Sequence, residues 1–119
     1  PEPKPEPKPE PKPEPPVETP AMKATKLIAE ADESYKVGAA LYVQIVKEMK
    51  TPPTTNDGLQ ALLDKKASAQ AELTKAREAY TAAREHARDQ AYVAGKLTNI
   101  DSAMSRLKVK EDEIRSLMK

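Results

Sequence analysis

The sequence predicts an all-α protein, with an N-terminal polyproline-II or disordered stalk followed by a three-helix bundle or a long coiled-coil-like helical hairpin. Three observations predict it. Proline fills every second position at the N-terminus. From residue 24 onward, apolar and small side chains recur at alternating steps of four and three residues, which is the spacing of a heptad seam. Pro52-Pro53 and Gly95 then interrupt this helical pattern. We therefore divide the chain into a stalk, residues 1–19, and a helical module, residues 20–119.

The stalk is built on a short repeat. The tetrapeptide PEPK occurs three times in residues 1–12 and is followed by PEPP at 13–16. Alternating prolines favour an extended polyproline-II chain, because proline fixes its own φ and keeps the preceding residue out of the α region. At about 3.1 Å per residue, 16 residues would reach roughly 50 Å. We expect a solvated spacer. The alternatives are a spacer that sets the width of a gap and a ligand for an aromatic groove through Pro13 and Pro16.

The tract resembles the Pro-Glu and Pro-Lys segments of TonB-type periplasm-spanning proteins and the proline-rich stalks of Gram-positive surface proteins. This resemblance covers the 16 low-complexity residues at the N-terminus. It implies an extracytoplasmic location, in a periplasm or at a cell surface, while a cytoplasmic location stays open. Residues 21–119 match neither family, so no functional residue is carried over.

The first helix is expected at residues 20–50. Thr19 has the side chain of an N-cap, and Pro20 is well placed at the first helical position. The stretch from Val37 to Val46 contains one polar residue, so we expect it to be the most buried part of the module. Pro52-Pro53 should end the helix. Its seam comprises Ala24, Ile28, Ala31, Tyr35, Gly38, Tyr42, Ile45 and Met49.

Two further helices are expected at residues 58–94 and 99–118. Asp57 and Gln60 have the spacing of a capping box, which would begin the second helix. Gly95 is the expected end of that helix.

A continuous helix through Gly95 is the alternative, and it would give a hairpin with a second arm of about 60 residues. We favour the bundle, because the hairpin would leave the last 20 residues without a partner in the same chain.

Composition excludes several kinds of site. The chain has no cysteine, which rules out disulfides and thiolate metal ligands, and its net charge is +1 with both signs interspersed. The long-range field that gathers nucleic acid or an anionic membrane is therefore missing. No run reaches the roughly 20 apolar residues of a membrane span, although an anchor upstream of Pro1 stays open.

Catalytic chemistry has no strong candidate in this sequence. His86 is the only histidine, and it stands next to charged residues on an edge expected to face solvent. The three glycines are scattered, so they form no phosphate-binding loop. We therefore expect no enzymatic activity, no cofactor and no bound metal.

The expected function is that of a non-catalytic structural or spacer protein, which presents an oligomerising helical module on the stalk in a cell-envelope or surface assembly. The alternative is a soluble adaptor whose helices bind one dedicated helical protein. The partner is a protein in both cases, either a second copy of this chain or a different helix. The residues expected to form the interaction seam are Ile28, Tyr35, Tyr42, Ile45, Met49, Leu73, Tyr80, Ile100, Leu107 and Ile114.

Overall fold

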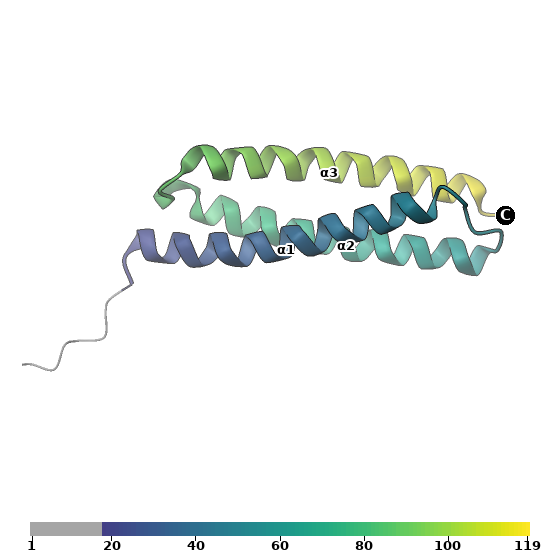
Figure 1. The fold of residues 1–119 in the computed structure, drawn as a ribbon, viewed down its shortest axis with the longest axis horizontal. Coiled ribbons are helices and arrows are strands. Elements are labelled where there is room, and N and C mark those ends of the chain that lie inside the picture. The colour runs from purple at the N-terminus through teal and green to yellow at the C-terminus, as the bar shows by residue number, and fades with distance from the viewer. Residues whose placement is uncertain (1–17) are drawn as a thin grey trace, which may run out of the picture.

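The computed structural model describes residues 18–119, which form three long helices and one short helical turn (Figure 1). Strands are absent from this part of the chain. The prediction of an all-α fold with three helices is confirmed for these residues. The predicted polyproline-II conformation concerns residues 1–17, which lie outside the described residues. The elements are α1 (Pro20–Glu48), α2 (Asn56–Ala83), the 3-10 turn η1 (Arg84–His86) and α3 (Gln90–Leu117).

α1 begins at the predicted residue and ends two residues before the predicted end. The Thr19 hydroxyl accepts a hydrogen bond from the N–H of Met22 at 3.2 Å, and Pro20 occupies the first helical position. Pro52-Pro53 follow in the loop after α1. Proline has no N–H to donate and its ring obstructs the preceding turn, so the helix cannot continue through them.

α2 begins two residues earlier than predicted and uses a different cap. The Thr55 hydroxyl accepts the N–H of Gly58 at 3.1 Å, so Thr55 is the N-cap. Asp57 lies inside the first turn, where its negative charge faces the positive end of the helix dipole. Gln60 was the expected second member of a capping box, but its side chain donates to Asp64 at 3.1 Å instead.

The boundary between the second and third helices was predicted in the wrong place. α2 ends at Ala83 and α3 begins at Gln90, so Gly95 lies within α3 and does not end α2. Gly95 also lacks the positive φ that a glycine helix cap would adopt. The break is made by Asp89, whose carboxylate accepts the N–H of Tyr92 at 2.9 Å and caps α3. The chain therefore turns back, and the hairpin with an unbroken second arm does not form.

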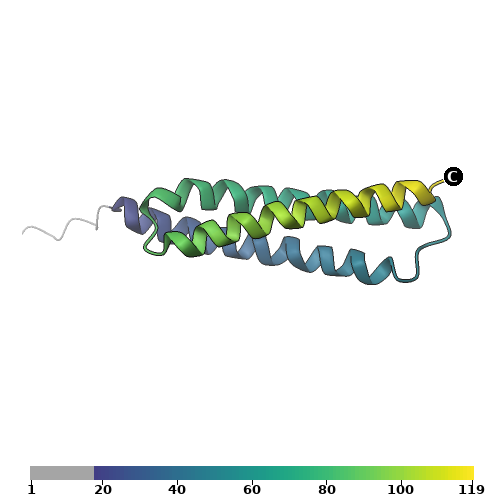
Figure 2. The same cartoon turned by 90° about the horizontal axis from the view of Figure 1, so that it is seen from above.

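The three helices lie side by side, with α2 antiparallel to both α1 and α3 (Figure 1 and Figure 2). α1 packs most extensively against α2, whereas α1 and α3 approach each other least. Buried residues recur every seven positions along the two outer helices, as a heptad seam requires. They are Ala24, Ala31, Gly38 and Ile45 in α1, and Val93, Ile100, Leu107 and Ile114 in α3.

α1 and α2 are held close together because small residues line their contact. A Cβ atom added at Gly38 would lie 2.8 Å from Cγ of Leu73 and 3.2 Å from the carbonyl oxygen of Ala69. Any side chain at this position would therefore force the two helices apart or displace Leu73. The absence of a Cβ at Gly38 sets the separation of α1 and α2 at this level.

α2 and α3 are joined by a covered ion pair in addition to their apolar contacts. Lys66 Nζ lies 3.0 Å from a carboxylate oxygen of Glu111, and the two side chains are only 14% and 15% exposed. Arg115 also donates to Glu111, at 3.1 Å. The hydrogen bond from Lys66, followed by that from Arg115, lowers the pKa of Glu111 to about 2. This carboxylate therefore stays charged at any ordinary pH.

The stretch from Val37 to Val46 is not the most buried part of the module, contrary to the prediction. Ile45 is fully buried, but Val37 is 44% and Val43 is 62% exposed. The reason is that α1 is covered on the side that meets α2, while the rest of its circumference has no comparable neighbour. Within residues 18–119, none of the helices combines the length and apolar character that a membrane crossing requires.

Candidate functional site

The ten residues of the predicted interaction seam all lie in or against the core of this one chain. Six of them are fully buried, and four are partly buried and packed against that core. The seam therefore holds the chain's own helices together, and its role in binding another chain stays a prediction. The buried six are Ile45, Leu73, Tyr80, Ile100, Leu107 and Ile114, and the partly buried four are Ile28, Tyr35, Tyr42 and Met49.

A polar cluster joins all three helices near the turn between α2 and α3. Asp32 of α1 accepts hydrogen bonds from the hydroxyl of buried Tyr80 on α2 and from the hydroxyl of Tyr92 on α3, the latter at 2.8 Å. Burial, followed by the hydrogen bond to Asp32, raises the pKa of Tyr80 above its ordinary value. The pKa of Tyr92 is also raised, chiefly by its hydrogen bond to Asp32. The cluster fixes the relative registers of the three helices.

Lys96 of α3 extends this cluster towards α1. Its Nζ lies 4.5 Å from the ring centroid of Tyr35 and 5.5 Å from that of Tyr92. Both distances are within the range of a cation–π interaction. The ring of Tyr35, on α1, therefore packs against the ammonium group of Lys96, on α3.

The only histidine does not take part in any such cluster. His86 lies exposed at the end of the short turn η1. Within the described helices and loops, no three His, Asp or Glu side chains gather closely enough to hold a metal ion.

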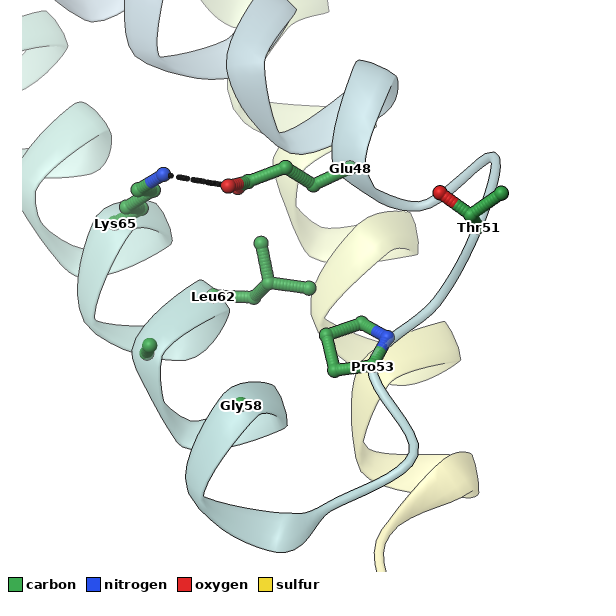
Figure 3. Close-up of a pocket in the computed structure, with 7 residues that line it drawn as sticks. Glu48, Thr51, Pro53, Gly58, Leu62 and Lys65 are labelled. Carbon is green, nitrogen blue, oxygen red and sulfur yellow. Dashed lines mark hydrogen bonds and ion pairs between the residues drawn. The ribbon is translucent and has the colours of Figure 1, made fainter.

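A hollow of about 370 Å³ lies beside the loop between α1 and α2 (Figure 3). Leu62 and Pro53 lie at its apolar part, and Gly58 lies on the same wall. Across its upper side, Glu48 and Lys65 form an ion pair of 2.9 Å, in which each charge satisfies the other. The two charged side chains that line this hollow are therefore paired with each other.

A second hollow of about 380 Å³ lies between α1 and α3, which are the two long helices with the least contact to each other. We call it the α1–α3 groove. Small side chains from both helices, Ala39 and Ala103, leave space at its centre. It is lined by Tyr35, Ala39, Tyr42 and Val43 of α1 and by Asn99, Ser102, Ala103 and Arg106 of α3.

The α1–α3 groove is apolar along α1 and polar along the outer edge of α3. Val43 is the most exposed of the large apolar residues in the described part of the chain, and it lies on the lip of the groove. Val109, which is 56% exposed, follows Ser102 by one heptad and so continues the same edge of α3. On this face the two most exposed of the large apolar side chains in the described residues lie in or next to a concave surface. It is therefore the candidate functional site.

Sequence reasoning identified part of this site and missed the rest. Tyr35 and Tyr42 were predicted as interaction residues, and both line the groove. Val43 and Arg106 were missed, the first because its apolar neighbours made it look buried. Asp32 was missed as well, although a signal existed: a buried tyrosine on the seam needs a partner for its hydroxyl, and a carboxylate next to a seam residue of another helix can supply one.

No protein-family model matches the chain, and comparisons with curated proteins and with solved structures return no significant match.

Proposed function

We propose that this chain is a non-catalytic protein-binding module, in which a three-helix bundle presents the α1–α3 groove to a helix of another protein. The observation that carries this proposal is the division of the apolar residues between two places. The six fully buried seam residues are enclosed by the chain's own helices, whereas Val43 stays open beside a groove lined by Tyr35 and Tyr42. Helices commonly bind such apolar grooves through residues spaced three and four apart.

This proposal favours an adaptor over an oligomer held together by the predicted seam. A fully buried side chain such as Ile45 or Leu107 cannot contact a second chain unless the module opens. The groove, in contrast, is available without any rearrangement. We further propose that the proline-rich tract is the spacer that carries this module, in a cell-envelope or surface assembly, where such spacers hold a binding unit away from its anchor.

The proposal is tested with a synthetic amphipathic peptide whose apolar face follows a heptad pattern and whose flanking positions are uncharged glutamines. Backbone amide shifts of the ¹⁵N-labelled full chain are followed as the peptide is added. We expect the shifts to concentrate between Tyr35 and Val46 and between Asn99 and Lys110. Val43→Asp should abolish them, since it places a charge on the apolar lip. Shifts that spread evenly over the three helices, or that survive Val43→Asp, would remove the groove as the binding site.

A further inference from the structure

We infer that the helix bound by the α1–α3 groove is amphipathic and carries acidic residues on both flanks. This inference rests on the proposed function and adds the charge of the partner. It is drawn from the distribution of ionic groups around the groove.

Several cations without an ion-pair partner in the described residues lie around the α1–α3 groove. Arg106 lines it directly, and Lys96 stands at one end over the ring of Tyr35. Lys36 precedes Val43 by one heptad, which places it on the same side of α1. Arg106 and Lys96 form no ion pair within residues 18–119, and none of the eight lining residues is a carboxylate.

Two carboxylates of α1 and α3, Asp32 and Glu113, are already engaged. Asp32 accepts two tyrosine hydroxyls, and Glu113 is paired at 3.1 Å with Lys110, which lies one heptad after Ala103 on α3. Lys110 is therefore neutralised, whereas Arg106, Lys96 and Lys36 form no ion pair among residues 18–119. An acidic partner would gain attraction along both edges, and a basic partner would be repelled.

The shape of the groove fits a helix lying lengthwise. α1 and α3 run in the same direction and border the groove on either side (Figure 1). Tyr35 and Tyr42 are spaced by one heptad on one wall, and Ala39 and Ala103 leave a recess between the two walls. A row of apolar side chains at heptad spacing can enter such a recess, with charged residues at its flanks meeting the edges.

Charge also separates this partner from a second copy of the same chain. Two copies packed through this groove would bring Arg106, Lys96 and Lys36 of each close to those of the other, which opposes a symmetric dimer. The apolar recess, with two tyrosines and two alanines, likewise favours a helix over a nucleic acid, which is held mainly by its phosphates.

The test compares three synthetic peptides of about three heptads that share one apolar face and differ in their flanks, which are Glu, Gln or Lys. Binding of each peptide to the full chain is measured by titration calorimetry at about 50 mM and about 500 mM salt. We expect the Glu peptide to bind at least about tenfold more tightly than the Lys peptide at low salt, and the difference to shrink at high salt.

The matched variants are Arg106→Glu, in the groove, and Lys75→Glu, on α2, which contributes no side chain to the groove. Both change the net charge by the same amount at an exposed position. Arg106→Glu should weaken the Glu peptide about tenfold and strengthen the Lys peptide. Lys75→Glu should leave both affinities within about twofold, because a distant exposed charge is screened.

The outcomes separate this inference from the proposed function. Equal binding of all three peptides, with amide shifts in the groove, would overturn the inference about charge and leave the proposed function in place. Failure of every peptide to bind would overturn the proposed function, and the inference with it. Two further results would overturn the inference: binding of vesicles with about 20% phosphatidylserine through Arg106, with no peptide bound, and a dimer in sedimentation that Val43→Asp dissociates.

Discussion

The two sides of α1 pack in contrasting ways. Towards α2, Ala31, Gly38 and Ile45 bring the helices so close that a single added Cβ would overlap Leu73. Towards α3, bulky Tyr35 and Tyr42 border a groove of about 380 Å³. The same heptad repeat runs along both sides, so the repeat alone does not decide whether an interface closes. The size of the residues on each side decides it, and the open side is the one available to a partner.

The largest expected effect comes from placing the same charge on the two sides of α1. Ile45→Asp puts a carboxylate at a fully buried position with no cation to pair with it, at a cost of about 3–5 kcal/mol. Domains of this size have about 5–15 kcal/mol of stability, so we expect the urea midpoint to fall by a large fraction of its wild-type value.

Val43→Asp is the matched control, two residues away on the same helix and 62% exposed. Its urea midpoint should correspond to a change within about 0.5 kcal/mol, as for most surface substitutions. If the two variants unfold alike, the assignment of closed and open sides is wrong.

The polar cluster at one end of the module should give the next largest effect. Tyr80→Phe removes a hydrogen bond between α2 and the Asp32 carboxylate of α1, and we expect a loss of about 1–2 kcal/mol in urea unfolding. Asp32 keeps its bond from Tyr92, which limits the cost.

This cluster also predicts a dependence on pH. The pKa of Tyr80 is raised in the folded chain, so the neutral phenol is favoured by folding. The stability it contributes is complete below the unfolded pKa of about 10 and is lost as the pH rises above it. The wild-type urea midpoint should therefore fall above about pH 10, and Tyr80→Phe should reduce that fall. An unchanged alkaline profile would mean that Tyr80 is not held as described.

Replacing each of two glycines with alanine should change the free energy of unfolding in opposite directions. Gly38→Ala gains helix propensity but crowds Leu73, so we expect a net loss of about 1 kcal/mol. Gly95→Ala meets no atom within 4 Å and lies in a helix interior, so it should gain roughly 0.5–1 kcal/mol. At the helix end that the sequence predicts for Gly95, a left-handed conformation would instead make Gly95→Ala destabilising. Urea midpoints that shift in the same direction for both variants would contradict the packing described for α1 and α2.

The smallest expected effect is that of removing the proline-rich tract. A chain that begins at Glu18 should melt at the same temperature as the full chain, within error, since the stalk is predicted to be a spacer separate from the module. A melting temperature lower by several degrees would indicate that the tract packs on the module, and the α1–α3 groove would then be its first candidate site.

The elements that the sequence predicted well are those whose signals are local. The Thr19 cap and Pro52-Pro53 set α1 to within two residues, because capping and the loss of an N–H act on the nearest turn. The prediction of the α2–α3 boundary was wrong because glycine is a strong sequence signal for a helix end, whereas Asp89 is a weak signal for a helix start. An aspartate caps a helix only if the chain before it leaves the helical conformation. No proline or glycine next to Asp89 indicates that the helix is broken there.

The candidate site could be predicted only in part, for a related reason. The seam position of Tyr35 and Tyr42 follows from heptad spacing, and both residues do pack against the core. Whether a flanking residue such as Val43 is covered depends on how closely the next helix approaches. The distance between two helices depends on the side chains of both, so it cannot be predicted from the apolar pattern of one helix alone.

The most direct test of the open and closed sides is the rate at which a thiol reagent modifies single cysteines placed on each, because the chain has no cysteine of its own. Val43→Cys and Ile45→Cys are each compared with the same variant in denaturant. We expect the thiol at position 43 to react at close to its denatured rate. The thiol at position 45 should react at least about a thousandfold more slowly, since it is reached only when the module opens. Equal protection of both thiols would mean that the α1–α3 groove is already covered in the free protein, and would contradict the account.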